Sequence, residues 1–162
     1  DSTADFAGTY TVASDGALTI TGLGQDFQAY ASDGGKLILV LDDDDSDDEV
    51  LLMVGLKKTA GANASLFSGD YQMNQFGGDD DSQWSTRING TADGTGNVSA
   101  AILSASDGDS GSFNLSYTVA GDGTMELTDV GTGIISSDGN TVLIVDTDAD
   151  DDVMIMIGIK KQ

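Results

Sequence analysis

The chain concentrates carboxylates in two short segments, and these are the residues whose type and spacing best suit chemistry. The first segment contains Asp42, Asp43, Asp44, Asp45, Asp47 and Asp48, and the second contains Asp146, Asp148, Asp150, Asp151 and Asp152. Carboxylates about 4 Å apart repel each other by about 1 kcal/mol in water, and more strongly near protein. Ca²⁺ removes that repulsion, because it binds about six to eight oxygen atoms in flexible geometry. We therefore predict a calcium site in at least one segment.

The spacing in the second segment narrows the type of calcium site. Asp146, Asp148 and Asp150 alternate along the chain, as ligands do in calcium loops. The central glycine and final glutamate of an EF-hand are missing and no helical pattern follows, which excludes an EF-hand. The alternative is that both segments are hydrated surfaces without metal. Their charge would then prevent edge-to-edge association of strands, or reflect a high-salt habitat.

Composition excludes several classes of function. The net charge is −22, from 28 acidic and 6 basic residues, and the chain contains neither Cys nor His. Such an acidic surface does not suit nucleic acid or an anionic membrane, and no apolar run approaches the roughly 20 residues of a membrane helix. The missing side chains remove disulfides, zinc–thiolate sites and imidazole-activated nucleophiles. We expect no enzymatic activity, no nucleic-acid partner and no membrane insertion.

Each acidic segment is the tip of an apolar hairpin. Lys36 to Lys58 and Thr141 to Lys161 share one pattern: an apolar strand, the acidic tip, and a second apolar strand that ends in Gly, an aliphatic residue and two lysines. Nearly every strand position is apolar, so we expect both faces of these hairpins to be covered.

We expect the two faces of the first hairpin to have different surroundings. We expect one face to fill a core: Leu37, Leu39, Leu41, Val50, Leu52, Val54 and Leu56. The opposite face contains Ile38, Val40, Leu51, Met53 and Gly55, which we match in the second hairpin with Leu143, Val145, Met154, Met156 and Gly158. Soluble monomers seldom leave such a patch open. Its cover is the other hairpin packed back to back, a second molecule in a homo-oligomer or fibre, or an apolar ligand.

The duplication extends beyond the hairpins. Tyr10 to Gly16 matches Tyr117 to Gly123, so residues 6–58 parallel residues 113–161. Period-two alternation and Asp-Gly turns predict an all-β fold, an antiparallel up-and-down meander that forms a barrel or sandwich. We divide it into a shortened first unit (residues 1–58, about five strands), a linker (59–66) and a second unit (67–162, about eight strands). Eight strands close a small barrel, whereas five leave open edges that require a partner.

A meander also predicts which turns are neighbours, because alternate turns lie at opposite ends. One end of the second unit then gathers Asp79 to Asp81, Asp107, Asp109, Asp129 and the tip from Asp146 to Asp152. The other end receives Asp93, Asp122 and Asp138, each in an Asp-Gly turn. The first of these ends is where we expect the calcium chemistry.

Two short motifs resemble a known family. Phe6-Ala7-Gly8-Thr9-Tyr10 and Phe67-Ser68-Gly69-Asp70-Tyr71 resemble the G-x-[WY] opening strand of lipocalin-like barrels. The remainder resembles secreted bacterial β-repeats that end in an aliphatic-Gly-aliphatic-Lys-Lys strand. Lipocalins prefer Trp where this chain has Tyr, and their closing Arg has no match. The resemblance implies a meander barrel and an internal ligand.

Together these features predict a secreted or cell-surface structural or adhesive β-protein. It would bind calcium at its acidic tips and self-assemble through the hairpins Lys36 to Lys58 and Thr141 to Lys161. The alternative is a lipocalin-like barrel that binds a small apolar molecule.

Overall fold

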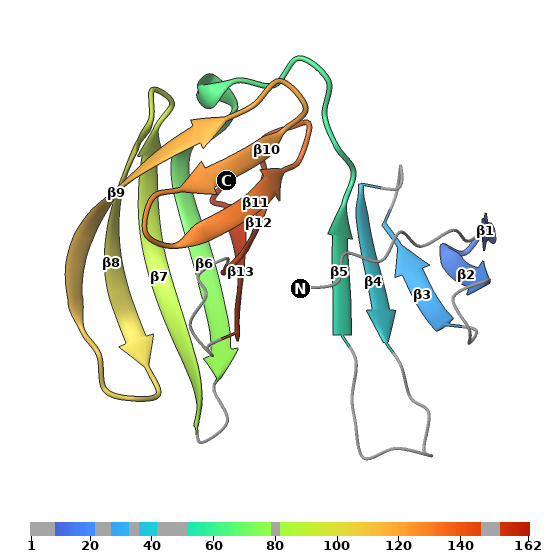
Figure 1. Ribbon diagram of the computed structural model, residues 1–162, viewed down its shortest axis with the longest axis horizontal. Coiled ribbons are helices and arrows are strands. Elements are labelled where there is room, and N and C mark those ends of the chain that lie inside the picture. The colour runs from blue at the N-terminus through green and yellow to red at the C-terminus, as the bar shows by residue number, and fades with distance from the viewer. Residues whose placement is uncertain (1–8, 22–26, 33–35, 42–51, 79–81, 147–152) are drawn as a thin grey trace. The chain divides into compact units, whose positions relative to one another are not determined.

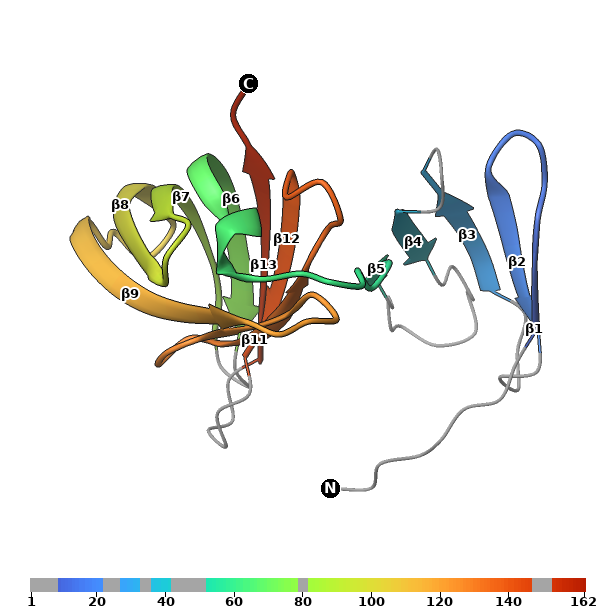
Figure 2. The ribbon, with the colours of Figure 1, turned by 90° about the horizontal axis from the view of Figure 1, so that it is seen from above.

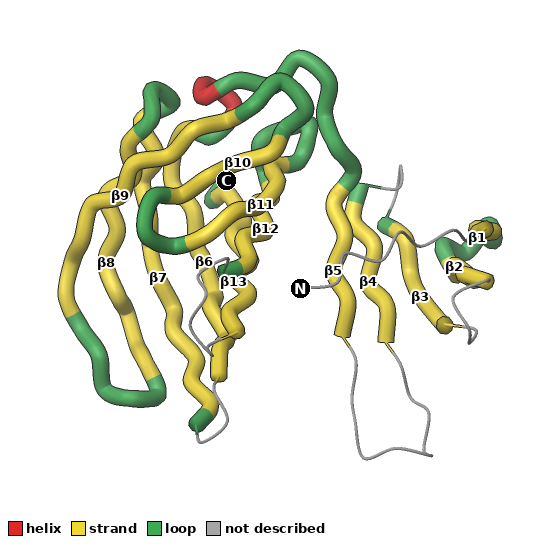
Figure 3. Tube along the Cα trace, viewed as in Figure 1, coloured by secondary structure: helices red, strands yellow, loops and turns green. Residues whose placement is uncertain are grey.

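The computed structural model describes residues 9–21, 27–32, 36–41, 52–78, 82–146 and 153–162 (Figure 1). The chain divides into two units, Asp1–Lys57 and Lys58–Gln162. The regular structure of the described part consists of β-strands and one short 3-10 helix, η2 (Ala64–Leu66; Figure 3). The strands are β1 Thr9–Val12, β2 Ala17–Thr21, β3 Phe27–Ala31, β4 Leu37–Leu41, β5 Leu52–Leu56, β6 Ser68–Gly78, β7 Gln83–Asp93, β8 Asn97–Ala105, β9 Gly111–Val119, β10 Thr124–Leu127, β11 Gly131–Ile135, β12 Thr141–Val145 and β13 Val153–Lys160.

The second unit is a closed antiparallel barrel of the eight strands β6 to β13 (Figures 1 and 2). Neighbours in sequence are neighbours in space, and β13 closes the ring by pairing with β6 from Val153↔Gly78 to Lys160↔Tyr71. The all-β meander predicted from the sequence is therefore confirmed, with the expected number of strands. Closure leaves this sheet without a free edge.

Period-two alternation places one face of every strand inside the barrel. On β7, Thr86, Ile88 and Ala92 are buried while Ser85 and Arg87 are exposed. Eight strands enclose a space that side chains can fill completely. The filling residues include Phe67, Tyr71, Met73, Ile88, Val98, Tyr117, Met125, Ile144, Met154 and Met156.

The first unit is a five-stranded antiparallel sheet with the order β1-β2-β3-β4-β5. Its core is small, since only Leu18, Ala29 and Val40 are buried among the described residues. Within the described part, β1 pairs only with β2, and β5 only with β4. The five strands with open edges predicted for this region are therefore present.

The hairpin faces differ from the prediction. Val40 is buried and Ile38 packs with it, whereas Leu39 is exposed, so the Leu37 face does not fill the core. The side chains of Leu41, Val50, Leu51 and Leu52 lie outside the described part. Register explains the error: with apolar residues on both faces, alternation carries no information about which face turns inward.

The same register corrects the match between the two hairpins. Ile38 pairs with Gly55 as Val142 pairs with Gly158, so Val142 and Ile144, rather than Leu143 and Val145, correspond to Ile38 and Val40. Val142 and Ile144 point into the barrel and are almost fully buried.

Residues 59–66, predicted as a linker, are hydrogen-bonded to the barrel. The Thr59 amide donates to the Asp122 carbonyl (2.9 Å) and the Gly61 amide to the Gly121 carbonyl (2.7 Å). Asn63 then starts η2, because its side chain accepts the Ser65 amide at 3.0 Å. This segment is structurally part of the second unit.

Two equivalent glycines provide a test of interior packing. A Cβ on Gly158 would lie 2.5 Å from Val142 Cγ2 and 2.9 Å from Met73 Cγ, whereas a Cβ on Gly55 would lie 3.8 Å from Ile38 Cβ. We expect Gly158→Ala to lower the unfolding free energy of the barrel by about 1–3 kcal/mol through overpacking. The matched variant Gly55→Ala should have little effect. Denaturant unfolding of both variants is the measurement, and equal losses would contradict this packing.

Candidate functional site

The predicted calcium ligands are attached to the ends of two equivalent hairpins. Nearly all of them lie outside the described residues: Asp42, Asp43, Asp44, Asp45, Asp47, Asp48, Asp148, Asp150, Asp151 and Asp152. The first tip follows the backbone pair Leu41↔Leu52. The second follows Val145↔Ile155, beyond which the Asp146 amide donates to the Met154 carbonyl at 3.0 Å. Paired strands run about 4.8 Å apart, so the described residues that flank each acidic segment are neighbours across the hairpin.

The barrel topology gathers further acids at the end where the second tip begins. The turn from β8 to β9 holds Asp107 and Asp109, and the turn from β10 to β11 holds Asp129. In a closed meander these turns lie at the same end as the connection from β12 to β13. Asp79 to Asp81, assigned to this end from the sequence, lie outside the described residues. Within the described part, no three acidic side chains are close enough together to hold a metal.

The aspartates at the opposite end shape turns. Asp93 Oδ1 accepts the amides of Thr95 (2.7 Å) and Asn97 (3.0 Å), and its Oδ2 accepts Asn97 Nδ2 (2.8 Å). These hydrogen bonds, led by the Asn97 side-chain amide, hold the pKa of Asp93 well below its usual range. Asp138 likewise accepts the Asn140 amide at 3.0 Å. These carboxylates are already used by the fold.

One ion pair at this end was not predicted from the sequence. Lys58 Nζ lies 2.7 Å from Asp122 Oδ2, and the Thr124 amide donates to Asp122 Oδ1 at 3.0 Å. The Lys58 ammonium, followed by the Thr124 hydrogen bonds, lowers the pKa of Asp122. The two partners are 64 residues apart in sequence. Only the fold brings them together.

The barrel interior is filled by aromatic and aliphatic side chains. Phe67 packs against Tyr71 and Tyr117, with ring centroids 4.7 Å and 5.0 Å apart. The Tyr117 hydroxyl donates to the Phe67 carbonyl (2.7 Å), the Tyr71 hydroxyl donates to the Gly139 carbonyl, and burial raises the pKa of Tyr71 to about 12. The cavity that remains beside Phe67 and Met73 measures about 10 Å³. Ligand pockets are typically about 300–1,000 Å³, so this cavity is much smaller than a typical ligand pocket.

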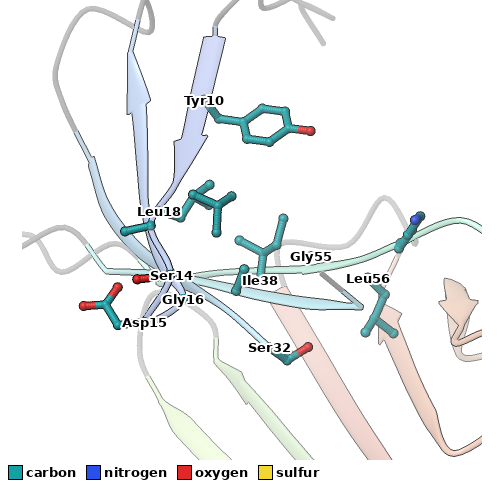
Figure 4. A pocket seen from close by; sticks show the side chains of 13 residues that line it. Tyr10, Ser14, Asp15, Gly16, Leu18, Ser32, Ile38, Gly55 and Leu56 are labelled. Atoms are coloured by element: carbon teal, nitrogen blue, oxygen red, sulfur yellow. The ribbon is translucent and has the colours of Figure 1, made fainter. Parts of the chain in front are cut away.

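The first unit instead carries an open hollow of about 810 Å³. Figure 4 shows Tyr10, Leu18 and Ile38 directed toward this space, with Gly55 on the adjoining strand. Tyr10 is 72% exposed, although a large aromatic side chain is usually well buried. The sequence indicated an uncovered apolar face here but could not show that it is concave.

Some side chains on the outer faces are also apolar and exposed. On the barrel these are Phe76, Leu103, Val145, Val153 and Ile159, of which Val145, Val153 and Ile159 belong to the second hairpin. On the first sheet Tyr30 and Leu39 are exposed in the same way. The described part of the chain contains no helix long and apolar enough to cross a membrane.

The Asp93 turn gives a pH-dependent prediction. A carboxylate whose pKa is depressed in the folded state stabilises that state above its unfolded pKa, near 3.8, and the stabilisation disappears as the pH falls through the folded value. Asp93→Asn keeps an acceptor at Oδ1 but removes the charge. We expect native protein to melt at a higher temperature than Asp93→Asn at pH 7, and the gap to shrink steadily below about pH 4. Melting curves from pH 7 to pH 2 measure the gap, and a constant gap would contradict the assignment.

Comparison with known proteins gives no relative of this chain: no protein-family model, no curated protein and no solved structure matches it. Function therefore has to be inferred from the two sheets, their charged turns and their apolar faces.

Proposed function

We propose that this protein is a structural or adhesive component of a secreted or cell-surface assembly, in which acidic hairpin tips bind calcium. The observation that carries the proposal is the filled barrel interior, with a remaining cavity of about 10 Å³ beside Phe67 and Met73. A barrel packed in this way serves as a rigid body, and its turns and outer faces are the parts available to partners. The proposed activity is therefore placed on those exposed parts.

Calcium binding is consistent with two groups of aspartates, one that forms turns and one that lies in the acidic tips. At the barrel end that contains Lys58, which we call the lysine-bearing end, Asp93 and Asp122 already accept hydrogen bonds from turn amides. Asp122 also forms an ion pair with Lys58. The acidic tips add many more carboxylates at the ends of two-stranded hairpins, where mutual repulsion favours a bound cation. Calcium would then stiffen the hairpins and neutralise part of the −22 charge.

A small-molecule carrier is the second candidate, and one observation favours it. The open hollow of about 810 Å³ beside Tyr10 and Leu18 is large enough for a ligand and partly apolar. A carrier of this kind would be isolated as a monomer with a compound bound to the first unit.

Calcium binding predicts a change in thermal stability. At a free calcium concentration about a hundred times the dissociation constant, a site present only in the folded state adds about 2.7 kcal/mol, which raises the melting temperature by roughly 10 °C. Asp148→Asn with Asp150→Asn, and separately Asp43→Asn with Asp45→Asn, should each reduce the shift if the corresponding tip holds the ion. Glu126→Gln, which removes a carboxylate from the exposed surface of β10, is the control and should keep the full shift.

Calorimetric titrations with calcium and with magnesium, at matched ionic strength, distinguish a specific calcium site from general screening of the negative charge. An unchanged melting temperature between calcium and chelator, with no heat of binding, would contradict the calcium proposal.

Self-assembly predicts concentration-dependent association through the hairpins. Val153 is 76% exposed and Ile159 52% exposed on the second strand of the hairpin. We expect Val153→Thr with Ile159→Thr to weaken association about tenfold or more, because two apolar contacts are lost. Leu103→Thr removes a similarly exposed apolar side chain from β8 and should have little effect. Sedimentation velocity over a concentration series is the measurement, and a monomer at every concentration would contradict assembly.

A further inference from the structure

The first sheet repeats the last five strands of the barrel. β1 to β5 run in the order of β9 to β13, with antiparallel pairing throughout. The pair Ile38↔Gly55 occupies the register position of Val142↔Gly158. The two sheets therefore share topology and register.

The turns repeat at the level of single hydrogen bonds. After the first strand of each set, an aspartate side chain caps the turn: the Ala17 amide donates to Asp15 Oδ1 and the Thr124 amide donates to Asp122 Oδ1, each at 3.0 Å. Before the fourth strand, a serine hydroxyl accepts the first strand amide: Leu37 to Ser32 Oγ at 3.0 Å, and Thr141 to Ser136 Oγ at 2.9 Å. The two sheets therefore share turn geometry as well as topology.

Two positions of the first sheet, Tyr10 and Gly55, are more open than their equivalents in the barrel, whereas Leu18 and Val40 are buried like theirs. Tyr117 is 3% exposed and its hydroxyl donates to the Phe67 carbonyl at 2.7 Å, with the Ala64 carbonyl 3.1 Å away, whereas its counterpart Tyr10 is 72% exposed. Gly158 faces Met73 at a distance that admits no Cβ, whereas the space in front of Gly55 is open. This difference in burial follows from the number of strands, which is eight in the barrel and five in the first sheet.

Three strands of the barrel, β6, β7 and β8, have no counterpart among the described strands of the first unit. In the barrel, β6, β7 and β8 supply the buried side chains Tyr71, Met73, Ile88, Ala92, Val98 and Ala100, and η2 is followed by buried Phe67. These strands pair with β13 on one side and with β9 on the other. The corresponding edges of the first sheet are β5 and β1, and the hollow of about 810 Å³ lies where the three strands would place their side chains.

We propose that the hollow and both edges of the β1–β5 sheet bind a three-stranded antiparallel segment of the β6–β8 type, joined to β1 through a short turn. The segment presents aromatic and aliphatic side chains at alternate positions, and glycine or alanine at crowded interior positions of its second and third strands, as Gly90 and Ala100 do in the barrel. The residue before its first strand offers a backbone carbonyl to the Tyr10 hydroxyl, as Phe67 does to Tyr117 in the barrel. With it, the first unit becomes a second closed barrel.

Three observations favour this occupant over others. Among the described strands, β1 and β5 each pair on one side only, so their outer edges offer backbone N–H and C=O groups, which a strand satisfies and an apolar small molecule does not. A second copy holds its own β6 to β8 in a closed barrel, so donating them would expose the core around Tyr71 and Met73. In the barrel, β8 reaches β9 through residues 106–110 alone, so a segment joined to β1 by a similar turn docks without opening another structure.

The test supplies the segment to the intact chain. A copy of residues 58–107 is joined ahead of Asp1, which reproduces the spacing between Asp107 and Tyr117 at Tyr10 because both intervals contain the same number of residues. Hydrogen exchange is followed by mass spectrometry in the presence of a chelator, so that calcium plays no part. The control extension carries Met73→Asp and Ile88→Asp in the copied strands only. Peptides from β12 serve as the internal reference.

We expect the native extension to slow exchange in β1, β2 and β4 by at least about tenfold and to become protected itself, while β12 stays unchanged. The charged extension should protect neither itself nor the first sheet. The proposal is overturned if the native extension remains unprotected, or if both extensions protect equally. It is also overturned if the unextended chain is already a dimer by light scattering with β1 and β5 protected, since a second copy would then be the occupant.

Discussion

Closure of the sheet is the constraint on which the rest of this structure depends. Pairing β13 with β6 and β8 with β9 satisfies every strand edge of the barrel and encloses an interior of packed aromatic and aliphatic side chains. The first unit has the same five-strand pattern but no counterparts of β6 to β8 among its described strands. There Tyr10 is exposed, and only three of the described residues are buried. Hydrophobic burial and edge pairing therefore act together, and neither is complete in the β1–β5 sheet.

The charge distribution follows from the same meander. Alternate turns fall at opposite ends, so the aspartates divide into two groups with different physical roles. Those of the lysine-bearing end, such as Asp93 and Asp122, are held by turn amides, by Asn97 or by Lys58, and their pKa values are lowered as a result. Those of the acidic tips are far more numerous than turn formation requires, which is why calcium binding is proposed for them.

Much of the fold was predictable because its signals are local. Alternation over Phe113 to Val119 and the Asp-Gly turns identify strands and their connections, and the match of Tyr10 to Gly16 with Tyr117 to Gly123 identifies the repeat. The prediction of which hairpin face points inward was wrong. Leu39 and Val40 are equally apolar, and Val40 is the buried one because it packs with Leu18 and Ala29, a contact that sequence spacing does not reveal. The Lys58–Asp122 ion pair and the hollow beside Tyr10 escaped for the same reason, since both depend on contacts between distant parts of a unit.

Site-resolved amide exchange in the unmodified chain tests the central claim most directly, because it compares equivalent positions in a closed and an open sheet. If closure governs stability, the amides of Leu18 and Val40 exchange at least about a hundredfold faster than those of their counterparts Met125 and Ile144. Equal protection at these paired positions, in a chain shown to be monomeric, would contradict the account, because the five strands would then be stable without the three that complete the barrel.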